Sequence, residues 1–118
     1  MQKIAIVVLS DTESGEALGR IVNALSAAKE YKEAGDEINI SFTGAGTKWI
    51  AALDKAGHPA HGLYQAVKDR VAGACGYCAD AFGQTEAAAA CGVPLLTDYG
   101  TNMSFRKLTG AGYQVITF

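Results

Sequence analysis

The stretch Lys3-Ile-Ala-Ile-Val-Val-Leu9 decides the expected fold. From Ile4 onward it is a continuous apolar run that is rich in β-branched residues. Such a run is typical of a strand that is buried on both faces, as in a parallel sheet between helices. Ser10, Asp11 and Thr12 follow the run, and their side-chain oxygens are suited to capping a helix.

Helical and strand patterns alternate along the rest of the chain. Apolar residues at helical spacing predict a long helix that closes near Gly35; they are Leu18, Ile21, Val22, Leu25 and Ala28. Further strands are expected at 38–42, 70–74, 93–97 and 113–118, and further helices at 47–55, 63–67, 79–90 and 102–109. This alternation indicates an α/β fold, a three-layer α/β/α sandwich with a five-stranded parallel sheet, formed by one domain over residues 1–118.

The composition of the chain limits which type of protein, which partners and which compartment are expected. The chain has 118 residues, 49% of them apolar and 19% charged, which is enough for one globular core. The net charge is −2 and the basic residues are scattered, so neither nucleic acid nor a membrane is an expected partner. No signal-peptide pattern precedes the first strand, and an odd number of cysteines argues against a secreted disulfide framework. The expected compartment is therefore the cytoplasm.

The loops after parallel strands share one edge of the sheet, which is where such sheets bind ligands. These loops begin at Ser10, Thr43, Cys75 and Asp98. We therefore expect a set of polar and thiol residues to lie near one another: Asp11, Thr12, Thr47, Lys48, Cys75, Cys78, Asp98 and Tyr99.

Cys75-Gly-Tyr-Cys78 stands where a strand is expected to give way to a helix. The backbone N–H groups of a helix N-terminus favour the thiolate, which is the reactive form of cysteine. Asp80 would oppose thiolate formation and Lys48 would favour it, so the direction of the pKa shift stays open. Two inert core thiols are the alternative. Cys91 is expected to be a packing residue.

A metal site and a thioredoxin-like fold are both disfavoured. His58-x2-His61 and Cys75-x2-Cys78 supply zinc-type ligands, but a strand separates them by roughly 16 Å, so no metal site is expected and the histidines are predicted to be solvated. Cys-Gly-Tyr-Cys is similar to the motif of thioredoxins and glutaredoxins. Those families place it after the first or second strand, whereas here it follows the third. Disulfide chemistry on a different fold stays open.

Gly44-Ala-Gly-Thr-Lys48 lacks the G-x-x-x-x-G-K-[ST] spacing of a phosphate loop. A glycine turn before a helix can still bind an anion. The candidate ligand-binding residues are therefore Asp11, Thr12, Gly44, Gly46, Thr47 and Lys48. A tight strand-to-helix turn without a ligand is the alternative.

Over nearly its whole length the chain resembles the DsrE-like (DsrE/DsrF, YchN-like) family of sulfur relay and sulfur oxidation. The resemblance rests on the Lys-Ile-Ala-Ile-Val strand, the Phe-Thr-Gly-Ala-Gly loop at 42–46, and Ala74-Cys75-Gly76 followed by a helix with a late glycine, Gly83. Gly-Val-Pro at 92–94 also fits. The fold that it implies is a five-stranded parallel sheet (DsrEFH-like), commonly assembled as trimers or hexamers.

The resemblance also implies a function. It places the family's sulfur-carrying cysteine on Cys75, which would hold sulfane sulfur as a persulfide between a donor and an acceptor protein, as a sulfurtransferase does, with no cofactor. Cys78 departs from the single-cysteine pattern, and it either resolves the persulfide as a disulfide or only packs. Two alternatives stay open: an oligomeric protein that binds a small ligand or anion without thiol chemistry, and a Cys75–Cys78 dithiol redox protein.

Overall fold

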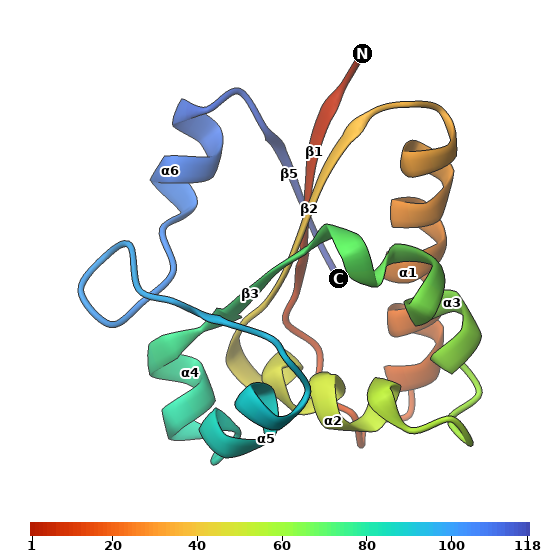
Figure 1. Cartoon of the computed structure of the whole chain (residues 1–118), viewed down its shortest axis with the longest axis vertical. Coiled ribbons are helices and arrows are strands. Elements are labelled where there is room, and N and C mark those ends of the chain that lie inside the picture. The colour runs from red at the N-terminus through yellow and green to blue at the C-terminus, as the bar shows by residue number, and fades with distance from the viewer.

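The computed structural model describes residues 1–118, and its five strands form one parallel sheet in the order β4-β3-β2-β1-β5 (Figure 1). The strands are β1 (Lys3–Val8), β2 (Glu37–Phe42), β3 (Val71–Cys75), β4 (Leu95–Leu96) and β5 (Gln114–Thr117). The topology confirms the predicted α/β fold, because every strand runs parallel to its neighbours and helices connect most of them.

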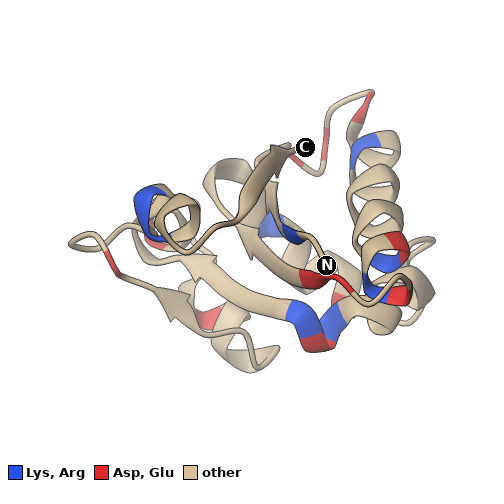
Figure 2. Cartoon of the chain, turned by 90° about the horizontal axis from the view of Figure 1, so that it is seen from above, with Lys and Arg blue, Asp and Glu red and all other residues tan.

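Helices lie on both faces of the sheet and at its carboxyl edge. They are α1 (Ala17–Glu33), α2 (Trp49–Asp54), α3 (His61–Val67), α4 (Gly76–Ala81), α5 (Thr85–Ala90) and α6 (Phe105–Gly110), with 3-10 turns η1 (Gly44–Lys48) and η2 (Lys68–Arg70). α1 and α3 cover one face, whereas α6 lies on the other (Figures 1 and 2). α2, α4 and α5 gather where the strands end (Figure 1).

The core follows the alternation of side chains along the strands. Ile4, Ile6 and Val8 of β1 belong to a large cluster of buried residues that includes Ile21 and Leu25 of α1. Side chains of neighbouring residues in a strand point to opposite faces, so Val7 faces the other side. There it packs with Cys75 and Met103 in a second, smaller cluster. The Cys75 side chain therefore lies on the face of the sheet that α6 covers, opposite to α1.

Several predicted boundaries differ from the structure, and four of the differences are informative. The helix expected at 79–90 is two helices, because Gly83 adopts φ +66° between α4 and α5. The helix expected from 102 begins at Phe105, since the Ser104 hydroxyl caps it by accepting from Lys107 N–H at 3.0 Å. The short helix begins at His61 and not at residue 63, and β4 spans two residues instead of five.

Charged residues of both signs are scattered over the elements, as Figure 2 shows. The longest helix, α1, has 17 residues, and none of the helices combines the length and hydropathy that crossing a membrane requires.

Candidate functional site

Cys75 is the last residue of β3 and the N-cap residue of α4. Its side chain is turned into the smaller hydrophobic cluster beside Val7 and Met103, and the residue is only 1% exposed. The predicted placement at a strand-to-helix junction is confirmed. The same placement buries the thiol, which the sequence pattern did not predict.

The segment 97–104, which connects β4 to α6, covers Cys75. Met103 N–H donates to Cys75 Sγ at 3.4 Å, and the Cys75 thiol donates to Asn102 Oδ1 at 3.8 Å. Tyr77 N–H also donates to the carbonyl of Thr101 at 2.7 Å, which ties the segment to the first turn of α4. We call this segment the cover. It has to move before a bulky reagent can reach Cys75.

Cys78 lies one helical turn after Cys75 and is half-buried. The Thr43 hydroxyl donates to Cys78 Sγ at 3.3 Å. Thr43 directly follows β2, so this contact joins the ends of two neighbouring strands. The edge rule that selected Thr47 and Lys48 could also have found Thr43. Nothing in the sequence pointed to Asn102 or Met103.

The surroundings of Cys75 favour its thiolate. Burial raises the pKa of the Cys75 thiol, but the backbone N–H groups of Cys78 and Met103 and the side chains of Cys78 and Thr43 outweigh it. The pKa of Cys75 therefore lies below its ordinary value of 9.0. From the sequence, the opposing charges of Asp80 and Lys48 left the direction of the Cys75 pKa shift open. In the structure, hydrogen-bond donors and not neighbouring charges account for the lowered pKa.

The cysteine pair thus stands at the carboxyl edge of a parallel sheet. Comparison with known proteins places the chain as a whole in a family. The model of the DsrE/DsrF-like family matches residues 2–118. This chain belongs to the DsrE/DsrF-like family. The general role of that family is sulfur relay.

One curated relative of this DsrE/DsrF-like protein is an uncharacterised protein of Methanocaldococcus jannaschii. It is 28% identical over 115 residues, which cover 97% of this chain and 93% of the relative. No solved structure matches the chain significantly.

Two predicted ligand-binding residues of this DsrE/DsrF-like protein pair with each other. Lys48 Nζ lies 3.4 Å from Asp11 Oδ1 and 5.7 Å from the centre of the Phe82 ring. Thr12 donates through its hydroxyl to Asp11 at 3.4 Å. Desolvation raises the pKa of Asp11, but the backbone N–H of Thr12 and the Lys48 ammonium outweigh it, so that the pKa is lowered. Lys48 therefore pairs with Asp11 in this structure.

The glycine turn at 44–46 is packed against β1. A Cβ atom at Gly46 would lie 2.2 Å from the carbonyl oxygen of Val8, so only glycine fits there. Gly44 has φ +56°, and its carbonyl accepts from the fully buried Thr47 hydroxyl at 2.9 Å. These contacts account for Gly44, Gly46 and Thr47 as turn-forming residues.

The remaining candidates lie on or near the cover. Asp98 forms an ion pair with Lys107 of α6 at 2.9 Å. Tyr99, which is 74% exposed, pairs its backbone with Asn102 through two bonds of 2.9 Å. The expected cluster therefore divides into two groups, Asp11 with Lys48 and the cysteines with the cover. Phe82, which contacts Lys48, and Thr43 lie between them.

The two histidines are half-buried, and one ring nitrogen of each contacts the backbone. His61 Nδ1 lies 2.7 Å from the carbonyl oxygen of Leu53, and His58 Nδ1 accepts from Ala60 N–H at 3.0 Å. The His58 ring also stands edge-on to Trp49, with the ring centres 5.8 Å apart. Both histidine side chains thus stabilise the loop between α2 and α3 through these contacts. No group of three or more His, Cys, Asp or Glu side chains is placed to hold a metal ion.

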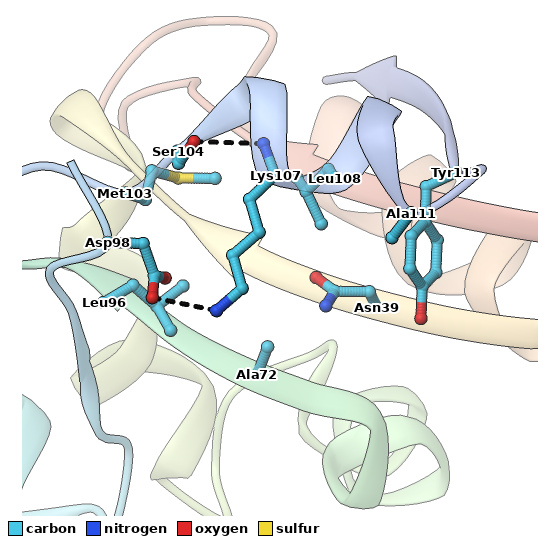
Figure 3. A pocket seen from close by; sticks show the side chains of 10 residues that line it. All are labelled: Asn39, Ala72, Leu96, Asp98, Met103, Ser104, Lys107, Leu108, Ala111 and Tyr113. Atoms are coloured by element: carbon cyan, nitrogen blue, oxygen red, sulfur yellow. Dashed lines mark hydrogen bonds and ion pairs between the residues drawn. The ribbon is translucent and has the colours of Figure 1, made fainter.

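A cavity of about 220 Å³ lies between α6 and the sheet (Figure 3). Asn39 of β2 and Ala72 of β3 form its floor, and the Asp98–Lys107 ion pair crosses it (Figure 3). Leu96 and Met103 also line it, and both pack in the cluster that holds Cys75. The cavity and the thiol therefore share a wall.

Proposed function

We propose that this protein is a cytoplasmic sulfur carrier of the sulfurtransferase type, which holds sulfane sulfur as a persulfide on Cys75. The observation that supports it most directly is the Met103 N–H that donates to Cys75 Sγ at 3.4 Å. A backbone donor stabilises a thiolate and, once sulfur is bound, the negative charge of the persulfide. The general role of the family in sulfur relay supports the same chemistry.

The transfer needs no cofactor. A thiolate attacks the outer sulfur of a persulfide on a donor protein, and the donor's sulfur–sulfur bond breaks as the new one forms. The donor leaves as a thiolate and takes up the proton. An acceptor thiolate then repeats the exchange on Cys75. The sulfane sulfur is thus transferred twice, and no net oxidation takes place.

Exposed apolar residues around the thiols support partner binding and self-assembly into a trimer or hexamer. They lie on α4, β4, the cover and α6: Tyr77, Phe82, Leu95, Tyr99 and Phe105. Contiguous exposed apolar residues mark protein-interaction surfaces, and these five residues are the candidates for such a surface. Light scattering after size-exclusion chromatography measures the assembly, and a monomer at all concentrations would contradict that part of the proposal.

Mass spectrometry tests the sulfur carrier. The native protein is exposed to a persulfide donor, alkylated and weighed intact. We expect a gain of one sulfur atom that reductant removes. In Cys75→Ser, a brief exposure to glutathione should already remove any sulfur that was gained. Cys91→Ser is the matched control, because Cys91 packs against the large core cluster, away from the site. Equal retention of sulfur by wild type and Cys75→Ser after exposure to glutathione would contradict the proposal.

The cavity under α6 favours binding of a small zwitterion as a second candidate function. A volume of about 220 Å³ holds about seven waters of about 30 Å³ each, which suits a ligand the size of a small amino acid. Lys107 and Asp98 offer opposite charges, and the Asn39 amide has no hydrogen-bond partner within the protein. None of the five cavities with a known lining is lined by Gly44, Gly46, Thr47 or Lys48 of the predicted anion site.

Thermal unfolding with a panel of neutral amino acids tests this second function. We expect a ligand to raise Tm in wild type and in Cys75→Ser alike, and to lose that effect in Asn39→Ala. Lys107→Met should also lose the effect, and Lys55→Met, which removes an exposed charge elsewhere, is its control. No shift in Tm with any member of the panel would contradict it.

The cysteine pair also allows a dithiol redox function. The Cys78 side chain is close enough to Cys75 to help lower its pKa. Titration in thiol–disulfide buffers, with alkylation of the reduced thiols, measures whether a reversible Cys75–Cys78 disulfide forms. Two thiols that stay free across the titration would remove this alternative.

A further inference from the structure

The two cysteines differ in what can reach them. Cys75 is 1% exposed and lies under Met103 and Asn102 of the cover. Cys78 is half-buried, and Tyr77 beside it is 58% exposed. A persulfide on a donor protein is carried by a bulky partner. The thiol that such a partner meets first is Cys78, as long as the cover stays in place.

We propose that Cys78 receives the sulfur from the donor and that Cys75 stores it. This inference rests on the proposed sulfur-carrier function and assigns the order of its steps. The cysteine that matches the family's sulfur carrier is, in this order, the second thiol to hold the sulfur.

The first step is an exchange at Cys78. The Cys78 thiolate attacks the outer sulfur of the donor persulfide, the donor's sulfur–sulfur bond breaks, and the donor leaves as a thiolate. Cys78 now carries the sulfane sulfur and its proton. The Thr43 hydroxyl, 3.3 Å from Cys78 Sγ, stabilises the attacking thiolate by donating a hydrogen bond.

The second step moves the sulfur inward. The Cys75 thiolate attacks the outer sulfur on Cys78, a bond forms to Cys75 Sγ, and Cys78 leaves as a thiolate. One sulfur–sulfur bond is broken and one is formed, so no oxidant or reductant is needed. The Thr43 hydroxyl now stabilises the leaving thiolate, and Met103 N–H faces the sulfur that holds the cargo.

Storage under the cover has a consequence for lifetime. Small thiols in solution strip sulfur from a persulfide only when they contact it. On Cys75 that contact requires local opening of residues 97–104, whereas on Cys78 it does not. Sulfur on Cys75 therefore lasts longer than sulfur on Cys78.

A competing reaction must be separated from this order. If the Cys75 thiolate attacks the inner sulfur on Cys78, a Cys75–Cys78 disulfide forms and hydrosulfide leaves. Atoms balance in that reaction too, but the cargo is lost. Free sulfide and a protein mass lower than that of the reduced form by two hydrogen atoms identify it, and their appearance as the main products would overturn the proposal.

The test follows the sulfur in time in a Cys91→Ser parent protein. Mixing with a persulfide donor is stopped at intervals by alkylation at acidic pH. Chymotrypsin cleaves after Tyr77 and so separates Cys75 from Cys78. We expect sulfur first on the Cys78 peptide and later on the Cys75 peptide.

Variants sharpen the outcome. We expect Cys78→Ser to load Cys75 at least about tenfold more slowly than the parent, because loading then waits for the cover to open. Cys75→Ser should keep sulfur on Cys78 and lose it to glutathione at least about tenfold faster than the parent. Thr43→Val should lengthen the time that sulfur spends on Cys78. Melting curves show that each variant is folded.

Two further results would overturn the order. One is a Cys78→Ser protein that loads Cys75 at the parent rate. The other is sulfur that is found on Cys75 in the parent before any appears on Cys78. Absence of added sulfur from the parent and all variants is a different result, because it contradicts the sulfur-carrier function itself.

Discussion

The backbone N–H of Met103 donates to Cys75 Sγ at 3.4 Å, although 28 positions separate the two residues. Met103 is buried and its side chain packs with Cys75 and Val7. One residue therefore both stabilises the thiolate and covers it. Reactivity at Cys75 depends on a balance between these two effects.

Replacing Met103 with alanine should make the Cys75 thiol easier for a reagent to reach. The variant keeps the N–H donor but loses the covering side chain, so we expect alkylation of Cys75 to accelerate by about tenfold or more. Rates of reaction with a maleimide, read by mass spectrometry, measure this. Phe105→Ala is the control, because Phe105 is an exposed residue of α6. Equal rates in wild type and Met103→Ala would show that the side chain does not limit access.

Thr43→Val tests the lowered pKa of Cys75. The wild-type thiol should titrate below pH 9.0, and removal of the Thr43 hydroxyl should move the midpoint of its pH–reactivity profile upward. The sign for stability follows from the same shift. Because the folded state has the lower pKa, the free energy of unfolding rises with pH between the folded and unfolded pKa values. A pH–reactivity profile that Thr43→Val leaves unchanged would show that the hydroxyl does not lower the pKa of Cys75.

Gly46→Ala tests whether the glycine turn is structural. The added Cβ would lie 2.2 Å from Val8 O, and either β1 or η1 must move. We expect a loss of about 2 kcal/mol or more in the free energy of unfolding. Gly57→Ala is matched to it, because no atom lies within 4 Å of that Cβ and its φ is not positive. A Gly46→Ala protein as stable as Gly57→Ala would refute the packing role.

Tyr64→Phe should not harm the protein. The Tyr64 side chain is fully buried and packs edge-on to Phe42, with ring centres 6.4 Å apart, yet its hydroxyl has no hydrogen-bond partner. Removal of an unsatisfied buried hydroxyl should leave the free energy of unfolding unchanged or raise it by about 1 kcal/mol. Urea unfolding measures this. Tyr64→Ala, which should lose about 3 to 5 kcal/mol, shows the value of the ring itself.

The tyrosines also provide a spectroscopic check of this burial. Burial, aided by the charges of Asp54 and Cys91, raises the pKa of Tyr64 to about 12. In an absorbance titration of wild type, the Tyr64 phenol should therefore ionise last or only on unfolding. The difference between the titration curves of wild type and Tyr64→Phe isolates it, and a difference centred near pH 10 would contradict the burial.

Local patterns were enough to predict most elements. The run from Ile4 to Val8 forms β1, and all five of its residues are buried, because a central parallel strand has helices on both faces. Cys75 stands at a strand end because the apolar run stops there. The break at Gly83 was missed, since a glycine within an alanine-rich stretch also fits a weakened continuous helix.

The candidate site was predicted only in part. The edge rule brought Asp11 and Lys48 together, and the structure pairs them at 3.4 Å. It did not separate them from the cysteines, because sharing an edge does not set which side chains meet. The edge rule could not predict the cavity under α6, because Asn39 lies in the middle of β2, away from the strand ends.

By itself the sequence determined the alternation of strands and helices, the parallel sheet and the position of Cys75 at a strand end. Those features depend on periodicity and on hydrogen bonds between residues close in the chain. Only the tertiary structure decided that Met103 and Asn102 cover Cys75 while Cys78 stays partly open. That difference depends on how segment 97–104 packs across the face of the sheet, and packing between distant segments leaves no periodic trace in the sequence.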